Sequence, residues 1–263
     1  MRGLLLAAGK GMRLRPITDT VPKSLVPVHG RPLLDYWLEL LFDAGVERVL
    51  INTHWLANKV RDHIECSCWR SRIDLVHEPD LLGTGGTLLA NHAYFGEEAL
   101  LLAHADNLTD FDVGAFMSAH AARPRQCLMT MLAFRTDDPS SCGILEVDER
   151  GIVLAFHEKI ANPPGNLANG AVYIIEPHVI EDLAAYDRPF VDLSVDVIPG
   201  LVNKILAFET TGYHRDIGNA ESLQRAHFEF SANRRSDRVM QMVGADRNMA
   251  CKSLAKNDPS ERA

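Results

Sequence analysis

The most constraining feature of this chain is its first turn, where an apolar strand runs directly into a loop with two glycines. Residues 4–8 read Leu-Leu-Leu-Ala-Ala, and Gly9 and Gly11 follow them. A backbone can approach a polyphosphate closely only where no Cβ intervenes, and the amides of such a loop can face an anion. Two cations, Arg13 and Lys23, come after the loop. The sequence therefore predicts a phosphate-binding site at the end of the first strand.

The glycine spacing argues against two other nucleotide-binding loops. A dinucleotide-binding fingerprint needs a third glycine where residues 12–14 read Met-Arg-Leu, so a nicotinamide-dependent dehydrogenase is disfavoured. A Walker loop needs a Gly-Lys-Ser/Thr triplet after four intervening residues. Arg13 stands instead where it can reach over the phosphates of a nucleotide. Lys23 lies beyond a proline-marked turn and can approach the phosphates from another side.

Composition sets the broad class. The chain has 263 residues, 46% of them hydrophobic, which fits one large domain with a substantial core. A net charge of −8 argues against nucleic-acid binding, which depends on Lys and Arg side chains that neutralise phosphates. No stretch is long enough to span a membrane, and we expect no membrane association. Five cysteines, an odd number, favour reduced thiols in a cytoplasm over a disulfide framework.

Helical and strand patterns alternate from residue 33 onward. We expect helices over 33–42, 56–64, 87–92 and 113–121, and strands over 46–52, 73–77, 99–104 and 127–134. That rhythm predicts a parallel, doubly wound α/β sheet, in which ligands bind at the carboxyl ends of the strands. Shorter strand-like pieces follow over 143–147, 152–157 and 170–175. We expect this second half to carry the acceptor substrate.

The apolar periodicity fades after about residue 230. We therefore divide the chain into a domain over 1–230 and a polar tail over 231–263. The composition of the tail predicts a short helix and disordered residues, with a homo-oligomer contact as the alternative.

Residues 6–16, Leu-Ala-Ala-Gly-Lys-Gly-Met-Arg-Leu-Arg-Pro, followed by Pro22-Lys23, resemble the signature of the sugar-1-phosphate nucleotidyltransferases. The likeness extends over roughly residues 1–230 and is closest to short mannose- or heptose-1-phosphate guanylyltransferases and N-acetylmuramate-1-phosphate uridylyltransferases. It implies a Rossmann-like, doubly wound mixed sheet with sugar-binding insertions, of the nucleotide-diphospho-sugar transferase type. It also implies a nucleotide-binding loop formed by Ala7, Ala8, Gly9, Gly11, Arg13 and Lys23. Met12 departs from the small hydroxyl residue usual in the family.

Two aspartates match the metal-binding positions of the family. Asp106 follows the apolar run 100–103, and Asp216 lies within Tyr-His-Arg-Asp-Ile-Gly-Asn over 213–219. A single aspartate after a strand is more often a turn former or a helix cap, but the resemblance implies that this pair holds Mg²⁺. Mg²⁺ favours one or two carboxylates together with phosphate oxygens and water. The resemblance also implies that Arg13, Lys23 and Asp106 are the catalytic residues.

The sugar phosphate is expected at four further positions of the family's pattern. Glu158 would hold sugar hydroxyls and Lys159 the sugar phosphate, although the same pair alone would be read as a solvated strand end. Gly143 and Asn169 match two other sugar-contact positions. The order Gly170-Ala171 inverts the usual small-Gly order after that asparagine.

The segment over 78–86, Glu-Pro-Asp-Leu-Leu-Gly-Thr-Gly-Gly, matches the base-reading segment of the family. This implies nucleotide contacts at Glu78, Gly83 and Gly86, whereas a plain loop before a helix is the other interpretation. A carboxylate at Glu78 can accept from both N1–H and the amino group of guanine, while uracil and thymine offer one imide donor. Glu78 therefore favours GTP, and backbone amides that read uridine are the alternative.

Together these patterns predict a cytoplasmic, Mg²⁺-dependent enzyme that joins an NTP and a sugar 1-phosphate into an NDP-sugar and pyrophosphate. Mannose- or heptose-type 1-phosphates with GTP are favoured. The alternatives are a UTP-dependent uridylyltransferase of an N-acetylhexosamine-type 1-phosphate and a non-catalytic regulatory subunit that binds sugar nucleotides. A regulatory subunit need not keep the cations and the aspartate pair together, so the sequence favours the enzyme.

Overall fold

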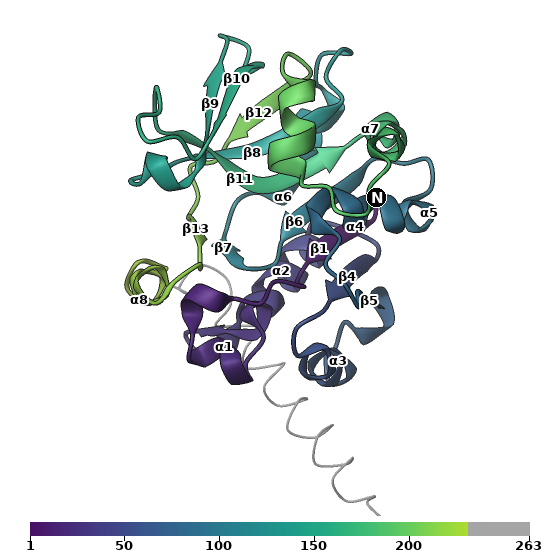
Figure 1. Cartoon of the computed structure of the whole chain (residues 1–263), viewed down its shortest axis with the longest axis vertical. Coiled ribbons are helices and arrows are strands. Elements are labelled where there is room, and N and C mark those ends of the chain that lie inside the picture. Colours follow the sequence, from purple (N-terminus) through teal and green to yellow (C-terminus); the bar gives the residue numbers. More distant parts are fainter. Residues whose placement is uncertain (231–263) are drawn as a thin grey trace, which may run out of the picture.

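The structure is a computed structural model that describes residues 1–230, and the expected tail over 231–263 lies outside the described residues (Figure 1). The strands are β1 (Gly3–Leu6), β2 (Pro27–Val28), β3 (Arg31–Pro32), β4 (Val49–Thr53), β5 (Ile73–His77), β6 (Leu100–His104), β7 (Asn107–Thr109), β8 (Met129–Arg135), β9 (Gly143–Val147), β10 (Val153–Glu158), β11 (Leu167–Ile175), β12 (Ile205–Glu209) and β13 (His214–Asp216). The α-helices are α1 (Ile17–Thr20), α2 (Leu33–Asp43), α3 (Ala57–Glu65), α4 (Gly83–Ala90), α5 (His92–Phe95), α6 (Val113–Ala121), α7 (Pro177–Leu183) and α8 (Ala220–Glu229).

A nine-stranded mixed sheet forms the centre of the molecule. Strands β5, β4, β1 and β6 lie side by side in that order and are parallel. Strand β11 follows β6 in the antiparallel direction, and β8 and β12 continue the sheet beyond it. The prediction of a doubly wound, mixed α/β sheet is confirmed, and β11 is the one antiparallel member between β6 and β8.

Alternating side chains of the inner strands feed two hydrophobic layers. Leu4 of β1 belongs to the layer that α4 and α7 cover, and Leu5 belongs to the layer that α2, α3 and α6 cover. All of β4 is buried. Strands buried on both faces read as continuous apolar runs, which is why the sequence marks them so clearly.

The second half of the described chain extends one end of the sheet. Strand β11 changes register between Asn169 and Tyr173, and its first part pairs with β9, which in turn pairs with β10. The β9–β10 pair lies at the opposite end of the molecule from α3 (Figure 1). The insertion expected for the acceptor substrate therefore forms the β9–β10 extension of the main sheet.

The segment that follows the first loop packs against α8, the last helix of the described chain. A third hydrophobic cluster joins Leu14, Val28 and Leu33 to Leu223 of α8, and α1 and α8 lie close to each other in Figure 1. Strand β13 pairs with β7, which follows β6 directly in the chain. No helix in the described part is long and apolar enough to cross a bilayer.

Candidate active site

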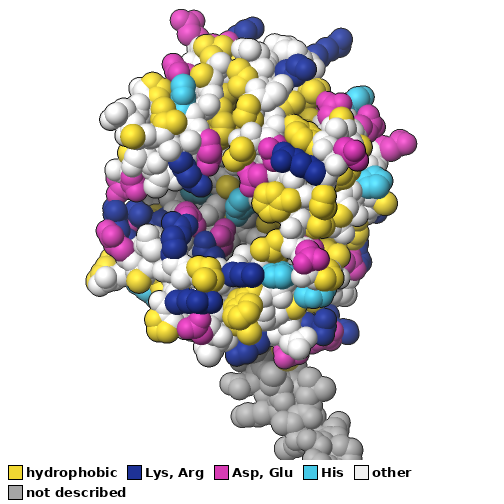
Figure 2. Space-filling model, in the orientation of Figure 1, with side chains coloured by type: hydrophobic (Ala, Val, Ile, Leu, Met, Phe, Trp, Pro, Cys, Tyr) yellow, Lys and Arg dark blue, Asp and Glu magenta, His cyan; other side chains and the backbone are white. Residues whose placement is uncertain are grey.

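A pocket lies at the carboxyl ends of β1, β4 and β6. The strand order reverses between β1 and β6, which is the place where open α/β sheets bind ligands. Figure 2 shows this face of the molecule hollowed, with Lys and Arg side chains gathered along one side. The pocket is lined by Leu6, Ala8, Gly9, Asn52, Glu78, Leu81, Gly83, Thr84, Thr87, His104, Asp106 and Phe190.

The two glycines of the first loop serve different structural purposes. Gly11 has a φ of +62°, and a Cβ there would lie 2.8 Å from Cγ2 of Thr18. The Thr18 hydroxyl also donates to the Gly11 carbonyl at 2.7 Å, so this turn is fixed by local packing. A Cβ on Gly9 would meet no atom within 4 Å, and Gly9 lines the pocket. Gly9 thus leaves the pocket side of the loop open.

Lys23 lies between the two candidate metal ligands. Its Nζ is 2.5 Å from Oδ2 of Asp106 and 3.3 Å from Oδ1 of Asp216. Residues far apart in the sequence therefore converge on one point.

The backbone around the aspartates is held from three sides. Asp216 stands opposite Asn107 in the β13–β7 pair, and the Ile217 amide donates to the Asp106 carbonyl at 3.1 Å. The indole of Trp37, on α2, donates to the Asn107 carbonyl at 2.8 Å. These bonds fix the backbone at Asp106 and Asn107, so the Asp106 carboxylate is presented from a rigid support.

The charges of the cluster hold one another ionised. Burial opposes ionisation of Asp106, but the Lys23 ammonium and His104 outweigh it and keep the pKa of Asp106 below its usual value. Burial likewise opposes the charge on Lys23, yet Asp106 and Asp216 raise its pKa above the usual value. The site therefore carries one cation between two anions near neutral pH.

The donor set fits Mg²⁺. Two carboxylates already converge on a single cationic group, and hard oxygen ligands are those that Mg²⁺ prefers. Among the described residues, no group of three or more His, Cys, Asp or Glu side chains could hold a metal ion. A Mg²⁺ ion held by Asp106 and Asp216 would therefore take further oxygens from phosphates and water, as Mg²⁺ commonly does.

Arg13 reaches the same cluster from the other side. Its Nη2 lies 3.9 Å from Oδ2 of Asp216, and its side chain is largely exposed. A Cβ on Gly218 would lie 2.7 Å from that carboxylate oxygen and 2.9 Å from Arg13 Nη2. A glycine at 218 therefore lets the guanidinium and the carboxylate approach each other.

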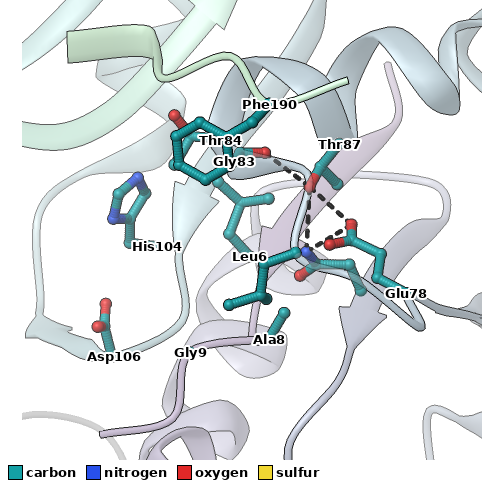
Figure 3. A pocket seen from close by; sticks show the side chains of 12 residues that line it. Leu6, Ala8, Gly9, Glu78, Gly83, Thr84, Thr87, His104, Asp106 and Phe190 are labelled. Carbon is teal, nitrogen blue, oxygen red and sulfur yellow. Dashed lines mark hydrogen bonds between the residues drawn. The ribbon is translucent and has the colours of Figure 1, made fainter. Parts of the chain in front are cut away.

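Glu78 lies on the wall of the pocket opposite Asp106 (Figure 3). It is 3% exposed. Its Oε1 accepts hydrogen bonds from Asn52 Nδ2 at 2.9 Å and from the Thr87 hydroxyl at 2.6 Å. The carboxylate is thus held by side chains from two other elements, β4 and α4.

The glycines that start α4 pack against a distant segment. The amides of Gly85 and Gly86 both donate to the Val191 carbonyl, at 2.8 and 3.1 Å. A Cβ on Gly83 would lie 2.5 Å from that same carbonyl oxygen, and one on Gly86 would lie 2.4 Å from the Pro189 carbonyl oxygen. This segment places the ring of Phe190 beside Gly83 and Thr84 in the pocket (Figure 3).

The expected acceptor residues gather at the β9–β10 pair. Gly143 stands opposite Glu158, and a Cβ there would lie 2.6 Å from Glu158 Oε2. Lys159 Nζ is 3.3 Å from Glu158 Oε1, and the Lys159 side chain is mostly exposed. Asn169 lies apart on β11, where its Nδ2 donates to the Tyr173 hydroxyl and its Oδ1 accepts from the Ala171 amide. Both ends of the Asn169 amide therefore have partners within the bulged part of β11.

The comparison with protein families decides the class. The model of a family described as nucleotidyl transferase matches residues 2–233. The chain belongs to this nucleotidyl transferase family. The match confirms the family resemblance that the sequence indicated.

Similar proteins differ in the nucleotide named for them. A mannose-1-phosphate guanylyltransferase from Mycobacterium tuberculosis is 29% identical over 84% of this chain and 62% of its own length. A glucose-1-phosphate thymidylyltransferase from Streptomyces griseus is 31% identical over 85% of this chain and 64% of its own length. The chain thus spans a little over 60% of the length of these relatives. HddC from Yersinia pseudotuberculosis, solved in complex with GMP-PN, has a TM-score of 0.73 and 26% identity over 88% of this chain and 99% of its own.

The structure brings the predicted nucleotide and metal residues together. Ala8, Gly9, Glu78, Gly83 and Asp106 line one pocket, and Arg13, Lys23 and Asp216 form the charged cluster beside it. The predicted residues Ala7, Gly11 and Gly86 are not among those that line the pocket, and a Cβ on Gly86 would meet the Pro189 carbonyl oxygen.

Sequence reasoning missed several residues of the site, among them Asn52, Thr87, Phe190 and Gly218. The pair Asn52-Thr53 at the end of an apolar strand is a signal that could have drawn attention to Asn52. Phe190 carried no signal, since it reaches the pocket through a segment more than a hundred residues from Gly83 in sequence.

Proposed function

We propose that this protein transfers a guanosine monophosphate group from GTP to a mannose- or heptose-type sugar 1-phosphate, releasing pyrophosphate. The observation that carries the choice of GTP is the buried Glu78 carboxylate in the wall of the pocket. Guanine presents two adjacent donors, N1–H and the amino group, and a carboxylate can accept from both. The guanylyltransferase relative and the GMP-PN complex of HddC support the same choice.

In this reaction an oxygen of the sugar phosphate attacks the α-phosphorus of the NTP. A new P–O bond forms while the bond from the α-phosphorus to the bridging oxygen breaks, and that oxygen leaves with pyrophosphate. A phosphate monoester has a second pKa near 6, so its oxygen is already largely ionised near neutral pH. The protein therefore needs no strong general base, and catalysis depends on positioning and on charge stabilisation.

The cations of the chain divide this work. Arg13 and Lys23 stand beside the pocket and would stabilise the charge on the triphosphate oxygens. Lys159, at the β9–β10 pair, would bind the phosphate of the sugar. Asp106 and Asp216 would hold Mg²⁺, which when bound offsets the charge of the triphosphate and of the leaving pyrophosphate.

Pyrophosphate release tests the proposal when the four NTPs are combined with a panel of sugar 1-phosphates. We expect the highest efficiency with GTP, and Glu78→Gln should lower the GTP/UTP ratio of kcat/KM by roughly ten- to a hundredfold. Glu176→Gln is the matched control, because Glu176 lies outside the pocket, beside His120 and Arg123. A parent that prefers UTP would support a uridylyltransferase instead. Nucleotide binding without pyrophosphate release would support a regulatory subunit.

A further inference from the structure

We propose that Asn52 and Thr87 are positioning residues that hold one oxygen of the Glu78 carboxylate, so that its other oxygen is presented to the base as an acceptor. The inference rests on the proposed role of Glu78 as the base reader. It assigns the choice between a guanine and a pyrimidine to a buried hydrogen-bond network rather than to Glu78 alone (Figure 3).

The orientation of the Asn52 amide is fixed from one side. Its Oδ1 accepts from the backbone amide of Ala7 at 2.7 Å, and its Nδ2 donates to Glu78 Oε1 at 2.9 Å. A flipped amide would set its NH₂ against the Ala7 N–H and its oxygen against the Glu78 carboxylate. Asn52 is 2% exposed, so water cannot readily compensate either mismatch. Asn52 must therefore face Glu78 as a donor.

Thr87 supplies the second donor. Its hydroxyl lies 2.6 Å from Glu78 Oε1 and 2.9 Å from the Gly83 carbonyl oxygen, and it accepts from Asn52 Nδ2 at 3.3 Å. The hydroxyl has a single proton, and the bond to a carboxylate is the stronger of its two choices. Thr87 therefore donates to Glu78, and Oε1 faces two donors.

This arrangement leaves Oε2 to face the base. The partner of Oε2 is the Leu82 amide at 3.5 Å, a long contact. Because Oε1 is held by Asn52 and Thr87, the carboxylate cannot rotate to offer a different edge without losing both donors. A glutamine at 78 would turn its carbonyl oxygen to these donors and its NH₂ toward the pocket. Because of this network, Glu78→Gln replaces the acceptor that faces the base with a donor.

The network also links base reading to the phosphate-binding loop. Ala7 begins that loop, and its amide is tied through Asn52 to Glu78. The base reader and the loop are thus held at a fixed separation by one buried asparagine. We expect a nucleotide whose base donates to Glu78 to place its phosphates correctly at Gly9.

Thr87 gives the sharpest test, because two substitutions separate its hydroxyl from its shape. Thr87→Val keeps the branched side chain and removes the donor, while Thr87→Ser keeps the donor. Thr130→Val is the control, since Thr130 is also fully buried, and its hydroxyl bonds His120 Nδ1 at 2.8 Å outside the pocket. The measured quantities are the GTP/UTP ratio of kcat/KM, equilibrium binding of GTP and of UTP by calorimetry, and Tm.

We expect Thr87→Val to lower the GTP/UTP ratio of kcat/KM about tenfold, because it removes one hydrogen bond to a charged group. Thr87→Ser keeps that hydrogen bond and should keep most of the parent's ratio. Thr130→Val should lower Tm and leave the ratio unchanged. Asn52→Asp provides a second route, because a carboxylate opposite Glu78 must share a proton with it, so the ratio should fall and become pH-dependent.

The outcomes separate this inference from the proposed function. If Glu78→Gln changes the ratio while Thr87→Val and Asn52→Asp do not, Glu78 reads the base without help and the positioning role is wrong. If Thr87→Val and Thr130→Val change the ratio equally, the effect is general destabilisation and the inference also fails. If Glu78→Gln leaves the ratio unchanged, the choice of base is not read at position 78, and both the inference and that part of the proposed function fall.

Discussion

The ammonium of Lys23 lies 2.5 Å from Oδ2 of Asp106, the carboxylate that we propose as a metal ligand. The same ammonium also contacts Asp216, so two anions share one cation. This arrangement lets the protein fold with both carboxylates ionised and close together. If Asp106 and Asp216 hold a metal ion as we propose, we expect Lys23 to exchange its carboxylate contacts for phosphate oxygens of the nucleotide.

The metal assignment predicts a loss of turnover when either carboxylate is neutralised. Asp106→Asn and Asp216→Asn should each lower kcat by at least roughly a hundredfold, because each removes a charge that orients Mg²⁺ and the triphosphate. Pyrophosphate release measures the effect, and a circular dichroism spectrum checks the fold. Asp74→Asn is the control, since Asp74 pairs with Arg48 on the surface. Near-parental turnover of a folded Asp106→Asn or Asp216→Asn protein would show that the carboxylate is not a ligand.

Acid should destabilise the parent more than the Asp106→Asn variant. The pKa of Asp106 in the folded protein lies below its usual value of 3.8, so the unfolded chain binds its proton first as pH falls. The stabilisation from Asp106 is therefore complete above that usual value and is lost as pH drops through the folded pKa. Urea unfolding of both proteins between pH 7 and pH 2 measures this. A difference in unfolding free energy that stays constant over that range would refute the pairing of Asp106 with Lys23.

Arg13 and Lys159 should affect different kinetic constants. Arg13 stands at the charged cluster, so Arg13→Ala should lower kcat by removing a fixed cation from the transition state. Lys159 lies at the β9–β10 pair, so Lys159→Ala should chiefly raise the KM for the sugar 1-phosphate. Steady-state kinetics with each substrate varied in turn distinguishes the two. An unchanged sugar-phosphate KM together with a raised NTP KM would reassign Lys159 to the nucleotide.

The parts of the site that the sequence revealed are local in the chain. The strand, the glycine turn and the following cations lie within 25 residues, and Asp106 follows its own buried strand. Strand ends of a parallel sheet meet at one edge, so placing Asp106 needed the strand pattern alone. The proximity of Asp106 and Asp216 could be inferred only from the family likeness. The β7–β13 pairing brings them together, and neither short strand has a sequence pattern that predicts this pairing.

The parts that the sequence hid depend on contacts between distant segments. The helix expected over 87–92 begins earlier, at Gly83. Its first turn was not predicted because it contains three glycines, which are poor helix formers. The Val191 carbonyl accepts from the amides of Gly85 and Gly86 and so helps to hold that turn. Strand β11 likewise starts before the expected residue 170, at Leu167. Its first residues were not predicted because the register shift and the positive φ of Ala171 interrupt the alternating pattern of a strand.

The close packing of α4 against the Pro189–Val191 segment gives the last prediction. Gly86 to Ala would ordinarily stabilise a helix by about 1 kcal/mol. Here the added Cβ would lie 2.4 Å from the Pro189 carbonyl oxygen, which is backbone and cannot rotate away. We expect Gly86→Ala to destabilise the protein by about 1–3 kcal/mol. It should also raise the KM for the NTP, because the same segment carries Phe190 into the pocket.

Gly200→Ala is the matched control for this substitution. A Cβ at Gly200 would meet no atom within 4 Å, so this change should leave Tm within a few degrees of the parent and both KM values unaltered. Thermal unfolding and steady-state kinetics on the three proteins decide the matter. A Gly86→Ala protein as stable as Gly200→Ala would mean that the segment gives way freely. An NTP KM unchanged despite lower stability would remove Phe190 from the nucleotide site.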